Sequence, residues 1–290
     1  MRVLILGASG MLGHQLWRSL SARFPKTYAT VRGRRDDYKK YNLFKDVDRV
    51  IENIDVMDLP GLEKVLDKIK PEIILNCIGV TKRREETHDL SVSTTLNAIL
   101  PHRLEAWAQK NNAKVVNFST DCVFDGKTGG YTEESAPLAE DIYGRTKAQG
   151  EVRSGSALTL RSSFIGPELG HGSELLEWFL AQSGVVKGFR NAIYSGLTTF
   201  ELCRVVTKIL VDHPNAKGLY NVSSDPISKF ELLMLIREKM ELDIKIVPED
   251  GFHCDRSLDS SKFRKEFNYC PPSWEAMIDE LAKELKGRVK

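Results

Sequence analysis

The chain has 290 residues, of which 41% are hydrophobic and 28% charged, and its formal net charge is +2. This composition is ordinary for a soluble globular protein, and the small net charge gives no reason to expect nucleic acid or a membrane surface as a partner. The five cysteines show neither CxxC spacing nor a zinc-ligand pattern, so we expect free thiols and no metal. No apolar run is long enough to cross a bilayer, and the first residues lack signal-peptide features, which predicts a cytoplasmic protein.

The first half of the chain alternates short apolar runs with amphipathic segments. Runs rich in β-branched residues predict buried strands at 2–6, 27–31, 72–79, 114–119 and 157–163. The segments between them predict helices at 11–24, 62–69, 90–110 and 143–154. This alternation implies a parallel sheet with right-handed crossovers, and therefore an α/β fold of the doubly wound Rossmann type.

The regular alternation of predicted strands and helices ends in the second half, where glycine-rich segments precede two capping boxes. "TTFE" from Thr198 and "SKFE" from Ser228 predict two helix starts, "GLYNVSS" between them predicts a strand, and a last helix is expected at 273–286. We expect a smaller, interleaved substrate lobe. The predicted dinucleotide-binding domain is 1–163 plus about 193–225, and the predicted lobe is about 164–192 plus 226–290.

A glycine pattern lies between the first predicted strand and the first predicted helix. In "LILGASGMLGHQL", Gly7, Gly10 and Gly13 are spaced as GxxGxxG. The first glycine permits a tight turn, the second lets the backbone approach a phosphate, and the third lets the helix pack closely on the strand. The helix then offers N–H groups to a pyrophosphate. A plain strand–turn–helix connection is the alternative, but the place in the first βαβ unit favours a dinucleotide.

The end of the second predicted strand bears on which dinucleotide binds. NAD-binding folds commonly place an acidic residue there, whereas this chain has "TVRGRR", with Arg32 in that region. A guanidinium can bind the 2′-phosphate of NADP(H) with two hydrogen bonds, so we favour NADPH, with NADH as the alternative. The alternative for Arg32 is a solvated surface charge. Asp55 in the next loop is a candidate for bonding the adenine, and Asp58 for a helix N-cap.

A candidate catalytic pair lies on the fourth predicted helix. Tyr143 and Lys147 in "EDIYGRTKAQGE" are four residues apart, on one helix face. A nearby ammonium is expected to lower the tyrosine pKa from its ordinary value near ~10. The pair could then protonate a carbonyl oxygen as hydride reaches its carbon. A solvated helix face is the alternative, but the glycine turn and "STD" one strand earlier favour the catalytic interpretation.

Together, the three glycines, Thr120 and the Tyr143/Lys147 pair resemble an extended short-chain dehydrogenase/reductase. Within that superfamily, "STDCVFDG" followed by "YGRTK" is similar to the dTDP-4-dehydrorhamnose reductases and related sugar-nucleotide reductases. The resemblance runs nearly from end to end and includes "TLRSSFIG" and the carboxyl-terminal "SLDSSKF" and "PPSWEAMIDEL".

The resemblance implies a role for each matching residue. Thr120 would hydrogen-bond the substrate oxygen, Tyr143 would be the acid/base, and Lys147 would also hold the nicotinamide ribose. Asn97 would support the lysine through backbone and water, with a helix-packing amide as the alternative. Gly79 would keep room for the cofactor. The other cofactor contacts predicted are Met11, Leu12, Val56 and Cys77.

Asp121 and Cys122 follow Thr120 and are expected at the edge of the substrate. Rhamnose-forming reductases usually have an aromatic residue where this chain has Cys122, which leaves the particular sugar open. A small packing residue is the alternative to a reactive thiol. Related dehydratases place an Asp-Glu pair after the threonine, and a thiol of ordinary pKa, near ~8.5, is a poor substitute for the second carboxylate. Candidates for the substrate diphosphate are Lys82, Arg83, Lys187, Arg190 and Arg256.

The sequence therefore predicts an NADPH-dependent reductase of a 4-keto-deoxy sugar nucleotide, in a pathway to a surface polysaccharide, with a homodimer as a candidate assembly. Two alternatives stay open. One is a non-catalytic NADP-binding regulatory subunit, because the beta subunit of methionine adenosyltransferase resembles the same reductases. The other is a sugar-nucleotide epimerase or dehydratase. The intact Thr/Tyr/Lys set favours an enzyme.

Overall fold

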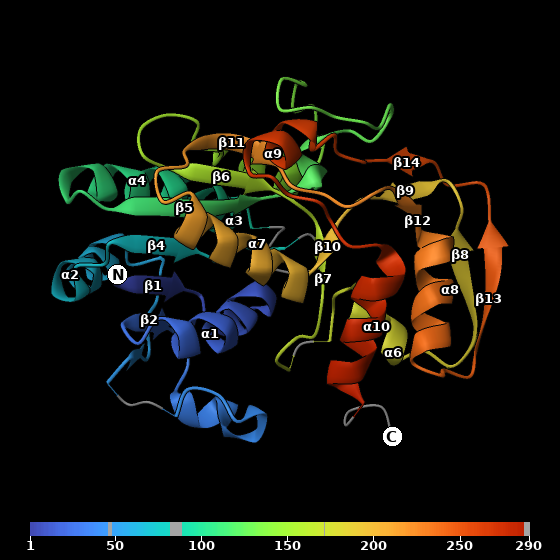
Figure 1. The fold of residues 1–290 in the computed structure, drawn as a ribbon, viewed down its shortest axis with the longest axis horizontal. Helices are drawn as coiled ribbons and strands as arrows, with labels where there is room; N and C mark the ends of the chain where they lie inside the picture. The colour runs from blue at the N-terminus through green and yellow to red at the C-terminus, as the bar shows by residue number, and fades with distance from the viewer. Residues whose placement is uncertain (46–47, 82–88, 171, 287–290) are drawn as a thin grey trace.

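The structure is a computed structural model that describes residues 1–45, 48–81, 89–170 and 172–286. Within these ranges, the largest element is a seven-stranded parallel sheet in the order β11-β6-β5-β4-β1-β2-β3 (Figure 1). Its strands are β1 (Val3–Leu6), β2 (Thr27–Thr30), β3 (Val50–Ile51), β4 (Ile73–Asn76), β5 (Lys114–Ser119), β6 (Leu158–Arg161) and β11 (Gly218–Asn221). The predicted α/β fold with a doubly wound parallel sheet is confirmed.

Helices cover both faces of this sheet because its strands are apolar on both sides. On β1, Val3 and Ile5 point into one core and Leu4 into another. The first core contains residues of α1 (Met11–Arg23) and α7 (Thr199–Asp212), which pack against each other in front of the sheet in Figure 1. The second core contains residues of α2 (Leu59–Ile69) and α4 (Leu100–Lys110).

The chain order reverses between β1 and β4. From β1 it winds outward to β2 and β3, and it then returns to form β4 on the other side of β1. Ligands of open parallel sheets bind at such a switch point, beyond the carboxyl ends of the strands. The glycine turn follows β1 and the "STD" motif follows β5 at this same edge.

The smaller part of the molecule consists of short strands and helices beside the carboxyl edge of the sheet (Figure 1). The strands are β7 (Phe164–Ile165), β8 (Gly184–Phe189), β9 (Ala192–Tyr194), β10 (Leu197–Thr198), β12 (Ile227–Ser228), β13 (Ile244–Glu249) and β14 (Cys254–Asp255). They pair as β10-β7, β12-β9-β14 and β13-β8. Its helices are α6 (Leu175–Leu180), α8 (Lys229–Lys239) and α10 (Trp274–Leu285), whereas α9 (Ser261–Glu266) lies against β11 of the large sheet.

Most predicted elements occur, with changed boundaries. Thr198 caps α7, and Ser228 forms the predicted capping box with Glu231 at the start of α8. The helix expected at 90–110 occurs with these bounds, but it is not α-helical throughout: α3 (Leu90–Ser93) continues into a π-helical segment over Thr94–Ile99 and then into α4. No helix in the described part of the chain is long and apolar enough to cross a membrane.

Candidate functional site

A cavity of about 690 Å³ lies at the carboxyl edge of the sheet, between the Rossmann core and the smaller part of the molecule. Its wall includes turn residues after three neighbouring strands, so the topology alone brings them together. From these turns come Gly10, Met11, Leu12, Cys77, Gly79, Thr120, Asp121 and Cys122. Tyr143, Lys147 and Arg256 complete the predicted site residues on this wall.

The glycine turn has the geometry that the spacing predicted. Gly7 has a φ of +73°, which a residue with a side chain rarely adopts. A side-chain carbon at Gly13 would overlap the carbonyl oxygen of Gly7, so this glycine is required for α1 to approach β1. Gly10 is the N-cap of α1 and lines the cavity. At the amino end of α1, therefore, backbone atoms border the cavity and no side chain at Gly10 covers them, which leaves room for a phosphate group.

The residues predicted to bind the adenosine end lie away from this cavity wall. Arg32 is exposed just after β2. Asp55 accepts a 3.0 Å hydrogen bond from the backbone N–H of Met57, and Val56 packs on the second core. The contacts of these three with a cofactor stay predictions. Asp58 caps α2 through the N–H of Gly61 at 3.0 Å, as the sequence suggested.

Helix α5 (Ile142–Gln149) carries the predicted catalytic pair, and its start is fixed by Asp141, whose carboxylate accepts the N–H of Gly144 at 2.8 Å. Burial raises the pKa of the Tyr143 phenol, while a hydrogen bond with the Thr120 hydroxyl acts in the opposite direction. The predicted lowering of the Tyr143 pKa by Lys147 is thus wrong for this structure, because burial dominates. A phenol that stays protonated at neutral pH can still donate its proton.

The Lys147 ammonium donates a 2.6 Å hydrogen bond to the backbone carbonyl of Phe118, near the end of β5. Burial lowers the pKa of Lys147 to about 8, although Glu151 and Cys77 oppose the change. The ammonium is therefore charged at neutral pH and fixed against the strand that leads to Thr120.

Gly79 and Asn97 meet beside this lysine. A side-chain carbon at Gly79 would lie 3.1 Å from the Asn97 Oδ1 and 3.8 Å from the Lys147 Nζ, so the glycine keeps this corner open. Asn97 is buried and bonds both backbone groups of Val80, accepting its N–H at 3.0 Å and donating to its C=O at 3.2 Å. Its amide also donates to the Thr146 hydroxyl at 3.3 Å. Asn97 thus ties the turn after β4 to α5, the packing role that was the alternative.

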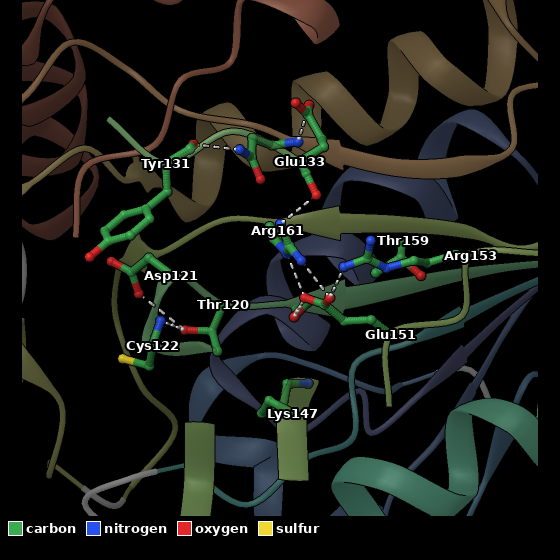
Figure 2. Close-up of polar contacts among 12 residues, drawn as sticks. Thr120, Asp121, Cys122, Tyr131, Glu133, Lys147, Glu151, Arg153, Thr159 and Arg161 are labelled. Atoms are coloured by element: carbon green, nitrogen blue, oxygen red, sulfur yellow. Dashed lines mark hydrogen bonds and ion pairs between the residues drawn. The ribbon is translucent and has the colours of Figure 1, made fainter. Parts of the chain in front are cut away.

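Thr120 directly follows β5 and lies in a cluster of short polar contacts, shown in Figure 2. Its hydroxyl donates to the Asp121 Oδ1 at 3.1 Å and accepts the N–H of Cys122 at 3.1 Å. The same Asp121 oxygen accepts a 2.5 Å hydrogen bond from Ser163. The buried Asp121 therefore orients the Thr120 hydroxyl and links it to the segment after β6.

Arg256 is the diphosphate candidate that the structure brings to the cavity. Its Nε donates to the carbonyl of Phe124 at 2.9 Å, and its Nη1 lies 3.8 Å from the Cys122 Sγ. Lys187 and Arg190 lie elsewhere, in ion pairs with Glu249 at 2.8 Å and Asp250 at 3.5 Å. Their proximity to the site is not supported, because Lys187 on β8 and Arg190 directly after it are both exposed and do not line the cavity. Lys82 and Arg83 fall outside the described residues.

A buried ion pair lies next to the cluster of polar contacts around Thr120. In Figure 2 the guanidinium of Arg161 faces the carboxylate of Glu151, with nitrogen–oxygen distances of 2.6 and 2.7 Å. Arg161 is 0% exposed and also lies over the ring of Phe124, 5.0 Å from its centroid. Glu151 accepts a further bond from the Ser119 hydroxyl at 2.8 Å, directly before Thr120. The pair thus joins β5, β6 and the end of α5.

Sequence reasoning missed several residues of the cavity wall, among them Ser163, Glu174, Tyr194, Lys229 and Phe252. Burial raises the pKa of the Tyr194 phenol, and the charges of Asp121, Cys122 and Glu174 act in the same direction. Most of these residues come from short strands and turns without a motif. Of these residues, only Tyr194 lies within a glycine-rich segment, the one at 184–196, which was the signal that could have pointed to it.

Among the described residues, no group of three or more His, Cys, Asp or Glu side chains could hold a metal ion. What the cavity does combine is an open helix terminus, a proton donor, a charged lysine and a hydroxyl. That combination can bind an anionic ligand and transfer a proton to a neighbouring oxygen.

Comparison with known proteins agrees with this geometry. A dTDP-4-dehydrorhamnose reductase of Aggregatibacter actinomycetemcomitans is 24% identical over 305 residues, covering 97% of this chain and 98% of that protein. Methionine adenosyltransferase 2 subunit beta of Rattus norvegicus is 27% identical over 150 residues, or 52% of this chain and 41% of that protein.

A solved structure has the same fold. It is that of dTDP-4-dehydrorhamnose reductase from Bacillus anthracis str. Ames in complex with NADP, with a TM-score of 0.79 at 22% identity, covering 98% of this chain and 99% of that one. The model of the family described as "RmlD substrate binding domain" matches residues 1–173, more than half of the chain. The chain therefore belongs to the RmlD substrate binding domain family.

Proposed function

We propose that the protein is an NADPH-dependent reductase that converts a 4-keto-deoxy sugar nucleotide to the corresponding alcohol. The observation that carries the proposal is that Thr120, Tyr143 and Lys147 line the same cavity as the residues of the glycine turn. The full-length similarity to a dTDP-4-dehydrorhamnose reductase supports the substrate class. The NADP in a related structure supports the cofactor. We place the reaction in the cytoplasm, in the supply of an activated deoxyhexose for a surface polysaccharide.

The wall fits a nicotinamide dinucleotide. Gly10 lets a diphosphate approach the amino end of α1, and Gly79 leaves open the corner that a side chain would fill. Lys147 would hold the nicotinamide ribose, and Met11, Leu12 and Cys77 would line the cofactor's path. When bound, the reduced nicotinamide supplies the hydride for the keto carbon.

The chain's own residues would handle the proton and the substrate. Tyr143 would donate its phenolic proton to the keto oxygen, since burial keeps the phenol protonated. The Thr120 hydroxyl would bond the same oxygen once its proton turns from the Asp121 carboxylate to the substrate, because a hydroxyl has only one proton to donate. Arg256, the guanidinium on the wall, would bind the substrate diphosphate. Cys122 would lie at the edge of the sugar, beside Arg256.

The proposal is tested by incubating the protein with limiting NADPH and an excess of 4-keto dTDP-, UDP- or GDP-sugars. A reductase forms product only up to the amount of NADPH supplied, and the absorbance of reduced nicotinamide falls in step. An epimerase or dehydratase would regenerate its cofactor, so turnover far beyond the NADPH supplied would contradict the proposal. Tyr143→Phe is the matched control for adventitious reduction.

A regulatory subunit is the second candidate, favoured by the similarity to methionine adenosyltransferase 2 subunit beta. That similarity spans about half of this chain. Retention of Thr120, Tyr143 and Lys147 in one site favours turnover instead. If the protein binds NADPH, reduces no keto sugar and co-purifies with a larger catalytic partner, the regulatory function is correct.

A further inference from the structure

Tyr194 places a second phenol on the cavity wall, and the proposed mechanism does not use it. It is the last residue of β9, is half-buried and lines the cavity. The described residues offer its hydroxyl no hydrogen bond, and this oxygen is not one of the inaccessible unpaired atoms, so it is open to the cavity. Because a tyrosine in such a position usually bonds a partner through its hydroxyl, this group is available to a ligand.

Packing holds the phenol in one place. Its ring lies against Trp274 at the start of α10, with 5.5 Å between the ring centroids and 41° between their planes. At the other end of the ring, a side-chain carbon at Gly196 would overlap the Tyr194 hydroxyl, so this glycine leaves the space that the phenol occupies. The hydroxyl therefore has a defined position without any hydrogen bond from the described part of the chain.

Strand pairing sets Tyr194 beside the candidate diphosphate ligand. β9 and β14 are parallel, and Ala192 lies opposite Cys254. Alternate residues of a strand face the same side, so Tyr194 and Arg256, each two residues further along, follow on that side. All four residues line the cavity. The phenol is thus a neighbour of the guanidinium that would bind the diphosphate.

The tip of Tyr194 lies toward the cluster around Thr120. The same side-chain carbon at Gly196 would be 2.5 Å from the carbonyl oxygen of Ser163, so the phenol tip and this carbonyl meet at one glycine. The Ser163 hydroxyl donates to Asp121 at 2.5 Å, and Thr120 donates to the same carboxylate oxygen. Tyr194 therefore reaches from the diphosphate side of the cavity toward the catalytic hydroxyl.

We propose that the Tyr194 hydroxyl bonds a sugar hydroxyl on carbon 2 or 3, between the diphosphate-bearing carbon and the keto carbon, and so selects substrates that carry it. The inference rests on the proposed function, in which the sugar extends from Arg256 to Thr120. Burial raises the pKa of the Tyr194 phenol, so the phenol keeps its proton and can donate it to a sugar oxygen. A site that bonds a substrate hydroxyl discriminates against the analogue lacking it.

Tyr194→Phe tests the proposal, because it removes only the hydroxyl and keeps the ring against Trp274. The substrates are the 4-keto-6-deoxy sugar nucleotide identified by the screen and its 2-deoxy and 3-deoxy analogues. The substitution should lower kcat/KM for the intact substrate by roughly 3- to 10-fold, the range for an uncharged hydrogen bond. For the analogue that lacks the bonded hydroxyl, it should change kcat/KM little. In the unaltered protein, that same analogue should be poorer than the intact substrate by a similar factor.

Tyr220→Phe is the matched control, because the Tyr220 hydroxyl donates to Glu266 at 2.6 Å and does not line the cavity. It should leave kcat/KM unchanged for all three substrates. Titration with the free nucleoside diphosphate of the substrate gives a second measurement. Tyr194→Phe should bind this diphosphate as the unaltered protein does, since the hydroxyl bonds the sugar. Thermal unfolding of both variants reports on folding.

Equal losses for all three substrates, or no loss for any, would overturn this inference and leave the proposed function intact. Weaker binding of the free diphosphate by Tyr194→Phe would also overturn it, because the phenol would then bond a phosphate. A fall in kcat of roughly 10²–10⁴ for every substrate would identify Tyr194 as a proton donor instead. If the unaltered protein reduces no keto sugar at all, the proposed function fails and this inference fails with it.

Discussion

The Lys147 ammonium and the Phe118 carbonyl are joined by a 2.6 Å hydrogen bond. Phe118 lies two residues before Thr120, so this bond sets the height of α5 relative to the end of β5. It thereby fixes the spacing between the phenol of Tyr143 and the Thr120 hydroxyl. The lysine thus has a structural role that does not depend on a bound cofactor.

Replacing Tyr143 by phenylalanine should remove the proton donor and little else. We expect turnover to fall by roughly 10²–10⁴, the usual range for loss of a general acid, while NADPH affinity is retained. Steady-state rates and cofactor titration by fluorescence measure the two effects. Parent-like turnover in the variant would remove Tyr143 from the mechanism.

The pKa of Lys147, lowered to about 8, predicts a pH dependence of catalysis. The ammonium is charged below this value and loses its proton as the pH rises through it, so kcat/KM for NADPH should fall above about pH 8. The phenol of Tyr143 has a raised pKa and stays protonated over this range. The residual activity of Tyr143→Phe should therefore keep the same falling limb. A profile that stays flat well above pH 8 would contradict the assignment.

Arg32 is expected to distinguish NADPH from NADH. Loss of one charge-assisted bond to the 2′-phosphate should cost Arg32→Ala roughly 10-fold in NADPH affinity, with little change for NADH. Arg34→Ala removes an exposed charge from the same cluster and is the matched control. If Arg32→Ala and Arg34→Ala lower the affinities for NADPH and NADH by the same factor, Arg32 is a surface charge and the cofactor preference has another origin.

Alanine substitutions at two glycines of the first turn should have different effects, one on cofactor binding and the other on stability. A side-chain carbon at Gly10 would lie 3.4 Å from the Gly7 oxygen, an ordinary contact, so Gly10→Ala should fold normally. The variant should nevertheless bind NADPH at least ~10-fold more weakly, because the added methyl group would occupy space that a phosphate needs. A 10-fold loss of affinity corresponds to about 1.4 kcal/mol. Gly13→Ala should instead lower stability, since its methyl group overlaps the Gly7 carbonyl. Urea unfolding and NADPH titration of both variants separate the effects.

The buried pair of Arg161 and Glu151 should be important for stability. Arg161→Met removes the buried cation from the Glu151 carboxylate and leaves only the half-exposed Arg153 beside it, which should cost about 3–5 kcal/mol in the free energy of unfolding. Arg153→Ala removes a half-exposed partner of the same carboxylate and should cost at most about 1 kcal/mol. Urea denaturation measures both, and equal effects would show that burial of the pair is unimportant.

The sequence predicted the strands and turns of the first half well because apolar runs and glycine spacing are local signals. It could not predict the π-helical segment over Thr94–Ile99, which depends on long-range contacts. Asn97 in this segment bonds Val80 and Thr146, and its carbonyl lies where a side-chain carbon at Gly150 would be. None of these neighbours is near in sequence.

The wall formed by Glu174, Tyr194 and Arg256 was hard to predict for the same reason. Its short strands pair over long distances in the chain: β9 pairs with both β12 and β14. Two- and three-residue strands carry too little periodicity to be recognised. Only Arg256 was named in advance, and its placement rests on a pairing that the sequence does not reveal.

The chain leaves the large sheet after β6 and returns to it as β11, after forming part of the substrate side and α7. A fragment ending near residue 173 would therefore expose the edge of β6, and it would uncover the face of α1 against which α7 now packs. Such a fragment should aggregate rather than persist as a nucleotide-binding module. Swapping substrate preference between relatives by fusing carboxyl-terminal halves would fail on the same ground. New specificities are more accessible through replacements within the cavity wall of an intact chain.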